Sequence, residues 1–182
     1  MLPIHAVTIC ITTFFDTRLS ERRANMASRR IRAGDRKMAR KPLTKEKLLP
    51  MTGASARERS LFYHVALDCW RRGHGNGRLV NELIRATYMA WFVQRAGFGD
   101  APVELFKAAE CIAEIALLRA HDSGQQEDWS LDEDSVSTFT TLLALHDAQL
   151  RTAPVHHFEK AERLLLAFLR GTERSPIPAP PD

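Results

Sequence analysis

The segment Leu79–Ala96 constrains the fold more than any other part of the chain. Its apolar residues recur at the spacing of one helix face, and the run MAWFV at residues 89–93 leaves that helix no polar side. A helix without a polar side has to be covered all round by other elements. The sequence therefore predicts a helix that enters a helical bundle and ends in its centre. Its first half keeps a polar stripe, formed by Arg78, Asn81, Glu82 and Arg85.

Four other segments have helical periodicity, and short turns with glycine or proline separate them. Two helix starts are predicted from capping boxes, at Ser55 with Glu58 and at Ser130 with Glu133. The expected helices cover residues 55–72, 79–96, 101–121, 131–151 and 155–170. The fold class is thus predicted to be all-α, with a single five-helix bundle over residues 55–171.

The segments on either side of the bundle have a different composition. Prolines and a glycine make residues 38–54 an extended lead-in with at most one turn of helix, at residues 45–49. The tail, residues 172–182, is rich in proline and is expected to be disordered.

Helical spacing also predicts which side chains are buried. The core side of the first helix is expected to hold Leu61, Phe62, Val65, Ala66, Cys69 and Trp70. The third helix is expected to expose a charged stripe of Glu104, Lys107, Glu110 and Glu114. In the fourth helix, His146 shares an apolar face, which is typical of a hydrogen-bonded core histidine rather than of a metal ligand.

The net positive charge of the chain comes from a leader, residues 1–37. This segment holds eight basic and three acidic side chains, a net charge of +5, which leaves −1 for residues 38–182. Its low apolar content predicts disorder. Three interpretations stay open: an extended gene prediction with the true start at Met38 or Met26, a basic arm that contacts nucleic acid, or an organellar transit peptide.

Composition argues against several classes of protein. No apolar run approaches the ~20 residues that span a bilayer, so we expect no membrane insertion. The three cysteines have no CxxC spacing, which favours reduced thiols and a cytoplasmic location. The adjacent pair His156 and His157 points in two directions on a helix and cannot readily chelate one ion. We therefore expect neither a metal site nor a cofactor.

The turn between the first two helices has the most unusual local composition, RRGHGNGR at residues 71–78. Backbone N–H groups that glycine leaves accessible at a helix N-terminus, with cationic side chains beside them, can bind a phosphate or carboxylate. The candidate anion-binding residues are Arg71, Arg72, His74 and Arg78. The turn has neither GxGxxG nor GK[ST], and a glycine helix cap followed by solvated arginines accounts for the same pattern.

Two longer stretches carry a family resemblance. KPLTK with LLPM at residues 41–51, and NELIR, AWF and GFG at residues 81–99, resemble short helical proteins of proteobacteria labelled Fis-type transcriptional regulators. The resemblance implies a DNA-associated regulator in a bacterial cytoplasm. A Fis-type protein carries a basic helix-turn-helix at its C-terminus, whereas the last helix here contains Glu159 and Glu162 and precedes the proline-rich tail.

No catalytic motif accompanies these features. The chain has no GxSxG sequence and no identifiable Cys/His or paired-acid arrangement, so we expect a protein that is not an enzyme. The leading prediction is a small interaction or regulatory protein that binds a protein partner or forms a homo-oligomer. A DNA-associated regulator, with nucleic acid bound through the basic leader, is the first alternative. Anion or small-ligand binding at Gly73–Arg78 is the second.

Overall fold

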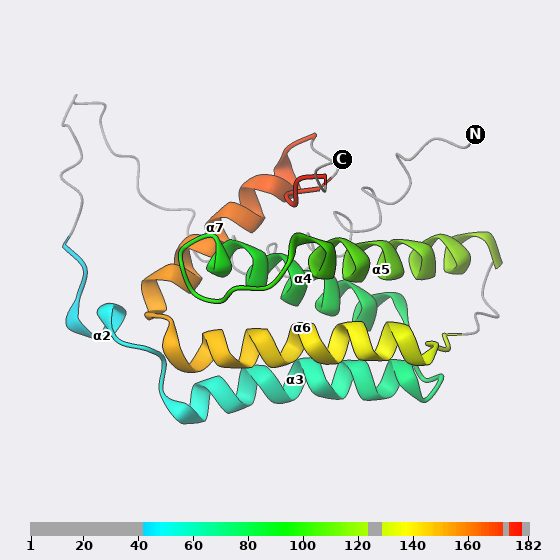
Figure 1. Cartoon of the computed structure of the whole chain (residues 1–182), viewed down its shortest axis with the longest axis horizontal. Coiled ribbons are helices and arrows are strands. Elements are labelled where there is room, and N and C mark those ends of the chain that lie inside the picture. The colour runs from blue at the N-terminus through cyan, green and yellow to red at the C-terminus, as the bar shows by residue number, and fades with distance from the viewer. Residues whose placement is uncertain (1–41, 124–128, 173–174, 180–182) are drawn as a thin grey trace, which may run out of the picture.

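Six helices form the described part of the computed structural model, which covers residues 42–123, 129–172 and 175–179 (Figure 1). They are α2 (Lys45–Leu48), α3 (Gly53–Arg71), α4 (Gly77–Gln94), α5 (Val103–Ser123), α6 (Glu133–Thr152) and α7 (Val155–Arg170). The predicted all-α class is confirmed. The predicted basic leader, residues 1–37, lies outside the described residues. Within them, no helix has the length and apolar character needed to cross a membrane.

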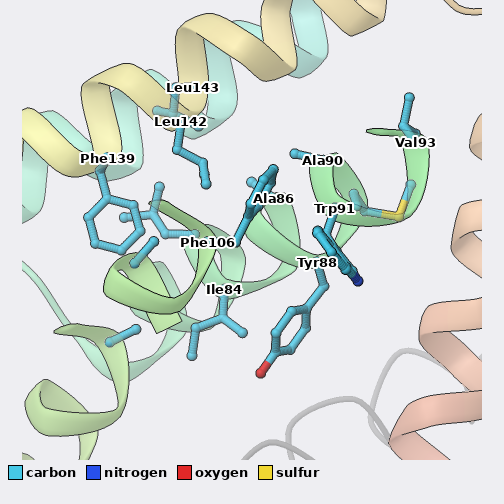
Figure 2. Packing of buried hydrophobic residues seen from close by; sticks show 14 of the residues in the cluster. Ile84, Ala86, Tyr88, Ala90, Trp91, Val93, Phe106, Phe139, Leu142 and Leu143 are labelled. Carbon is cyan, nitrogen blue, oxygen red and sulfur yellow. The ribbon is translucent and has the colours of Figure 1, made fainter. Parts of the chain in front are cut away.

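Helix α4 lies at the centre of the arrangement, in contact with α3, α5, α6 and α7. Every residue from Ala86 to Trp91 is buried, as the apolar run in this segment predicted. Small side chains at Ala86 and Ala90 are fully buried and let neighbouring helices approach closely. Figure 2 shows Leu142 of α6 pointing towards the layer that holds Ala86 and Phe106. The most apolar helix of the chain therefore forms the centre of one continuous core.

The two predicted capping boxes are wrong in register. Helix α3 begins at Gly53, and its N-cap is Thr52 rather than Ser55. The side chain of Thr52 accepts a hydrogen bond from the backbone N–H of Ser55 (3.3 Å). Helix α6 begins at Glu133, where Asp132 accepts from the N–H of Ser135 (2.7 Å). Serine, threonine and aspartate are all favoured at helix N-caps, so residue type alone did not identify the capping residue. The residues that cap are those with an extended backbone before the helix, Thr52 and Asp132.

Part of the predicted disordered tail is packed against the core. Ile177 is 2% exposed, and the indole N–H of Trp91 donates to the carbonyl oxygen of Pro176 (3.1 Å). The apolar side chain of Ile177, between two prolines, anchors this segment to the core, which the proline-rich composition of residues 172–182 did not predict. Residues 173–174 and 180–182 lie outside the described part of the chain.

The lead-in lies along α7. Its single turn of helix, α2, is confirmed, and Lys47 forms an ion pair with Glu159 (2.8 Å). The N–H of Val155 donates to the carbonyl oxygen of Leu49 (3.0 Å), so backbone contacts attach this segment at the start of α7. The side chains of Leu48 and Leu49 are exposed.

Candidate functional site

The four predicted anion-binding residues lie in and beside the turn between α3 and α4. Arg71 ends α3, Arg72 and His74 lie in the turn, and Arg78 lies in the first turn of α4. All four are exposed, and the guanidinium of Arg72 is paired with Asp68, one turn earlier on α3 (2.9 Å). Ligand binding by these residues stays a prediction.

Capping and packing account for the glycines and the asparagine of this turn. Gly73 has φ +76°, the left-handed conformation of a helix C-cap, and the N–H of His74 donates to Cys69 O (2.8 Å). The side chain of Asn76 accepts from the N–H of Leu79 (3.0 Å) and so occupies the cap position of α4. A Cβ atom on Gly75 would lie 2.8 Å from Trp70 and 2.9 Å from Trp129. Gly75 is required because the indole ring of Trp70 and the Cβ atom of Trp129 approach its backbone.

We expect Gly75→Ala to lower the free energy of unfolding by about 2 kcal/mol, because the new methyl group overlaps the indole ring of Trp70 and the Cβ atom of Trp129. Urea unfolding followed by circular dichroism measures the change. Gly53→Ala is the matched control, since the nearest atom to its Cβ, at 3.7 Å, belongs to the flexible side chain of Arg57. Equal stability of the Gly75→Ala variant and the wild type would contradict the packing assigned to this turn.

A second cluster surrounds a carboxylate that was expected to be exposed. Glu110 is 4% exposed, so the predicted solvated stripe on α5 is wrong at this position. Its oxygens accept from the hydroxyl of Tyr88 (2.7 Å), the ammonium of Lys107 (2.8 Å) and the hydroxyl of Ser175 (2.9 Å). Burial and the neighbouring Glu110 charge raise the pKa of Tyr88 well above its usual value. Because three donors engage this carboxylate, it fixes the tail to α4 and α5 rather than offering a free base.

The third feature is an exposed apolar surface on α3. Leu61, Phe62 and Val65 are 64%, 44% and 49% exposed, although the sequence predicted them on the core side. The residues that α3 does bury are Ala56, Ala66, Leu67 and Trp70. The prediction is wrong because α3 lies at the margin of the structure, packed mainly against α4 and α6, and these two neighbours cover only part of its circumference.

Helix α6 continues this surface. Thr140, Thr141, Ala144 and Ala148 are exposed along it at helical spacing. The hydroxyls of Thr140 and Thr141 donate to the carbonyl oxygens of Val136 and Ser137 (2.8 and 3.0 Å), which leaves the methyl groups as the less polar part of each side chain. Asp147 of α6 is bound to His64 of α3 (2.9 Å), so the two exposed surfaces adjoin.

We call this surface the α3·α6 face. It consists of Leu61, Phe62, Val65, Thr140, Thr141, Ala144 and Ala148. The hydrogen-bonded side chains of His64 and Asp147 lie between its two halves, and further charged residues lie at both of its ends. Exposed large apolar side chains surrounded by polar ones are typical of protein interfaces. Periodicity could not have found the α3 half, because the apolar side chains of α3 occupy more than one side of the helix.

Arrangements for metal binding are absent from the described ranges, where no three His, Cys, Asp or Glu side chains are placed to hold one ion. The rings of His156 and His157 lie with their centroids 4.0 Å apart and their planes tilted by 41°. The Nδ1 atom of His156 lies 2.9 Å from the carbonyl oxygen of Lys47, so this side chain links α7 to the lead-in.

No family model, curated protein or solved structure matches the chain.

Proposed function

We propose that this protein is a small, non-enzymatic interaction protein that binds another protein through the α3·α6 face. The observation that supports the proposal is the exposure of three large apolar side chains, Leu61, Phe62 and Val65, beside an uncharged surface of α6. Single exposed apolar residues are normal on a protein surface, but three large ones within about one turn of the same helix indicate an interaction site. Burial of this patch by a partner removes apolar area from water and stabilises the complex.

The alternatives have less support among the described residues. DNA binding depends on the basic leader, residues 1–37, which lies outside them. A helix-turn-helix in the described part of the chain would use α4 and α5, and Glu104 is exposed at the start of α5, where a carboxylate would face phosphates. Anion binding at Gly73–Arg78 has exposed cations in its favour, but Asn76 already satisfies an amide of the helix N-terminus.

Site-specific photo-cross-linking in living cells tests the proposal. A photoreactive amino acid at position 61 is expected to give a discrete cross-linked protein adduct, because the α3·α6 face is covered by a partner. The matched control is position 164 on α7, where Leu164 is 42% exposed but lies outside this face. Adducts of equal yield at both positions, or none at position 61, would show that the α3·α6 face binds no protein.

A further inference from the structure

We infer that the place on α4 and α5 where the C-terminal tail is bound is a peptide-binding site, which takes a short Ser-Pro-aliphatic segment of another protein when the tail leaves it. We call it the tail site and define it by Tyr88 and Trp91 of α4 and Lys107 and Glu110 of α5. The chain's own tail is then an intramolecular competitor for the partner. This second binding site does not depend on the α3·α6 face.

Helices α4 and α5 bring a charged pair and an indole donor together in the tail site. Figure 2 shows the ring of Tyr88 pointing away from Leu142 and Leu143 of α6. Its hydroxyl donates to Glu110 (2.7 Å), which places this carboxylate of α5 beside α4. The side chain of Glu110 is 5% exposed, and Lys107 is paired with it at 2.8 Å. Few, precisely placed polar groups in an otherwise apolar site are typical of sites that select a ligand.

Three consecutive tail residues supply the matching groups. The hydroxyl of Ser175 donates to Glu110 (2.9 Å) and accepts from the ammonium of Lys107 (2.9 Å). The carbonyl oxygen of Pro176 accepts from the indole N–H of Trp91 (3.1 Å), and the side chain of Ile177 is buried. The next two residues, 178 and 179, are exposed. Recognition therefore needs one hydroxyl, one carbonyl and one aliphatic side chain.

The bound segment brings its own satisfied backbone. Pro176 has no N–H group to bury, and the N–H of Ile177 donates to the hydroxyl oxygen of Ser175 (3.1 Å). Proline also restricts the free segment, so less conformational entropy is lost on binding. These properties belong to the three residues and not to their attachment to α7. The same segment in another chain would therefore fit the tail site equally well.

The walls of the tail site are held by contacts that do not involve the tail. Tyr88 packs on Phe168 of α7 with ring centroids 5.4 Å apart, and Trp91 packs on Phe106 with centroids 5.3 Å apart. Glu110 keeps Tyr88 and Lys107 as partners. Departure of the tail would leave the indole N–H of Trp91 without its acceptor. Because an unpaired donor is costly, the open site favours a ligand that offers a carbonyl and a hydroxyl.

Attachment of the tail to the bundle sets how strongly it competes. Only residues 171–174 separate Ser175 from the end of α7 at Arg170. A short linker of this kind gives a tethered segment an effective concentration of the order of millimolar. A partner segment consequently binds well only when it is presented at a high local concentration or when the tail is released.

Nuclear magnetic resonance of the full chain with a synthetic peptide, RSPIPA, the sequence of residues 174–179, tests the inference. In the Ile177→Asp variant, which frees the site, the peptide is expected to shift the indole N–H resonance of Trp91. The indoles of Trp70 and Trp129, which lie beside Gly75 at the other end of α4, are internal controls and should not shift. The wild type should need about tenfold more peptide for the same shift. A peptide with aspartate in place of its isoleucine is the matched control and should not bind.

Ser175→Glu is a second variant that leaves Ile177 in place. It sets another carboxylate against Glu110 and is expected to release the tail and to bind the peptide as Ile177→Asp does. Failure of both variants to bind the peptide, or equally tight binding by the wild type, overturns the inference. A wild-type dimer in sedimentation velocity that Ile177→Asp converts to a monomer would identify the tail of a second copy as the occupant, and would also overturn it.

Discussion

Replacement of Trp91 by alanine is expected to lower the free energy of unfolding by about 3 to 5 kcal/mol. Trp91 is 6% exposed, and its ring packs edge to face on Phe106 with centroids 5.3 Å apart. Its indole N–H also holds the tail through the carbonyl oxygen of Pro176. The substitution therefore creates a cavity in the central helix and releases a contact that fixes Ile177. Since small domains have only about 5 to 15 kcal/mol of stability, the variant will be marginally folded.

Urea unfolding followed by circular dichroism measures this loss. Trp91→Phe is the informative comparison, because it keeps an aromatic ring against Phe106 but removes the donor to Pro176. We expect it to lose about 1 to 2 kcal/mol, from the missing hydrogen bond and the smaller ring. A Trp91→Ala protein with the unfolding midpoint of the wild type would show that α4 is not the centre of the core.

The sequence predicted α4 and α7 well for physical reasons. A helix with no polar side, as at residues 89–93, has only one stable position, inside the bundle. The bounds of α7 follow from Pro154 at its start and Gly171 at its end, and the structure confirms Val155–Arg170. These signals come from the residues of the helix and its ends, so they do not depend on which other helices pack against it.

The orientation of α3 could not be predicted in the same way. Its apolar residues, from Leu61 to Trp70, surround more than half of the helix, so periodicity gives no unique buried side. Which side is buried depends on the number and position of the neighbouring helices. The α3·α6 face could therefore not be predicted from the sequence. Its α6 half includes Thr140 and Thr141, whose hydroxyls bond to backbone carbonyls of their own helix.

The burial of Glu110 was missed for a different reason. Two of its partners, Tyr88 and Ser175, are 22 and 65 residues away in the chain, so no local sequence pattern predicts these hydrogen bonds. Only Lys107, three residues earlier on the same helix, was a visible partner. In a solvated stripe the same Lys–Glu spacing is also common, and it cannot by itself distinguish a buried carboxylate from an exposed one.

His146 is expected to make the protein less stable in mild acid. Its ring is 2% exposed and packs against Tyr63 and Phe158, with centroids 5.6 and 6.1 Å away. The amide nitrogen of Gln149 donates to Ala90 O and Phe98 O, so its oxygen is left to accept from Nδ1–H of His146. The neutral ring of His146 therefore supplies the hydrogen bond that the oxygen of Gln149 accepts. Burial lowers the pKa of His146 to about 4.

The direction of the effect follows from proton linkage. In the unfolded chain a histidine has a pKa of about 6.5, so between pH 6.5 and 4 the unfolded state binds a proton that the folded state does not. The free energy of unfolding consequently falls as the pH falls through this window. Between pH 7 and pH 5 the contribution of His146 amounts to about 2 kcal/mol.

Urea unfolding at pH 7 and pH 5 measures this loss, with His146→Leu as the comparison. The leucine variant is less stable at pH 7, because the oxygen of Gln149 loses its donor, but its stability should depend less on pH by about 2 kcal/mol over this interval. His157, whose pKa burial also lowers, is retained in both proteins, so its contribution cancels in the comparison. Identical pH dependence of the two proteins would mean that His146 is protonated as readily in the folded state as in the unfolded state, and that its ring is not enclosed by Tyr63 and Phe158.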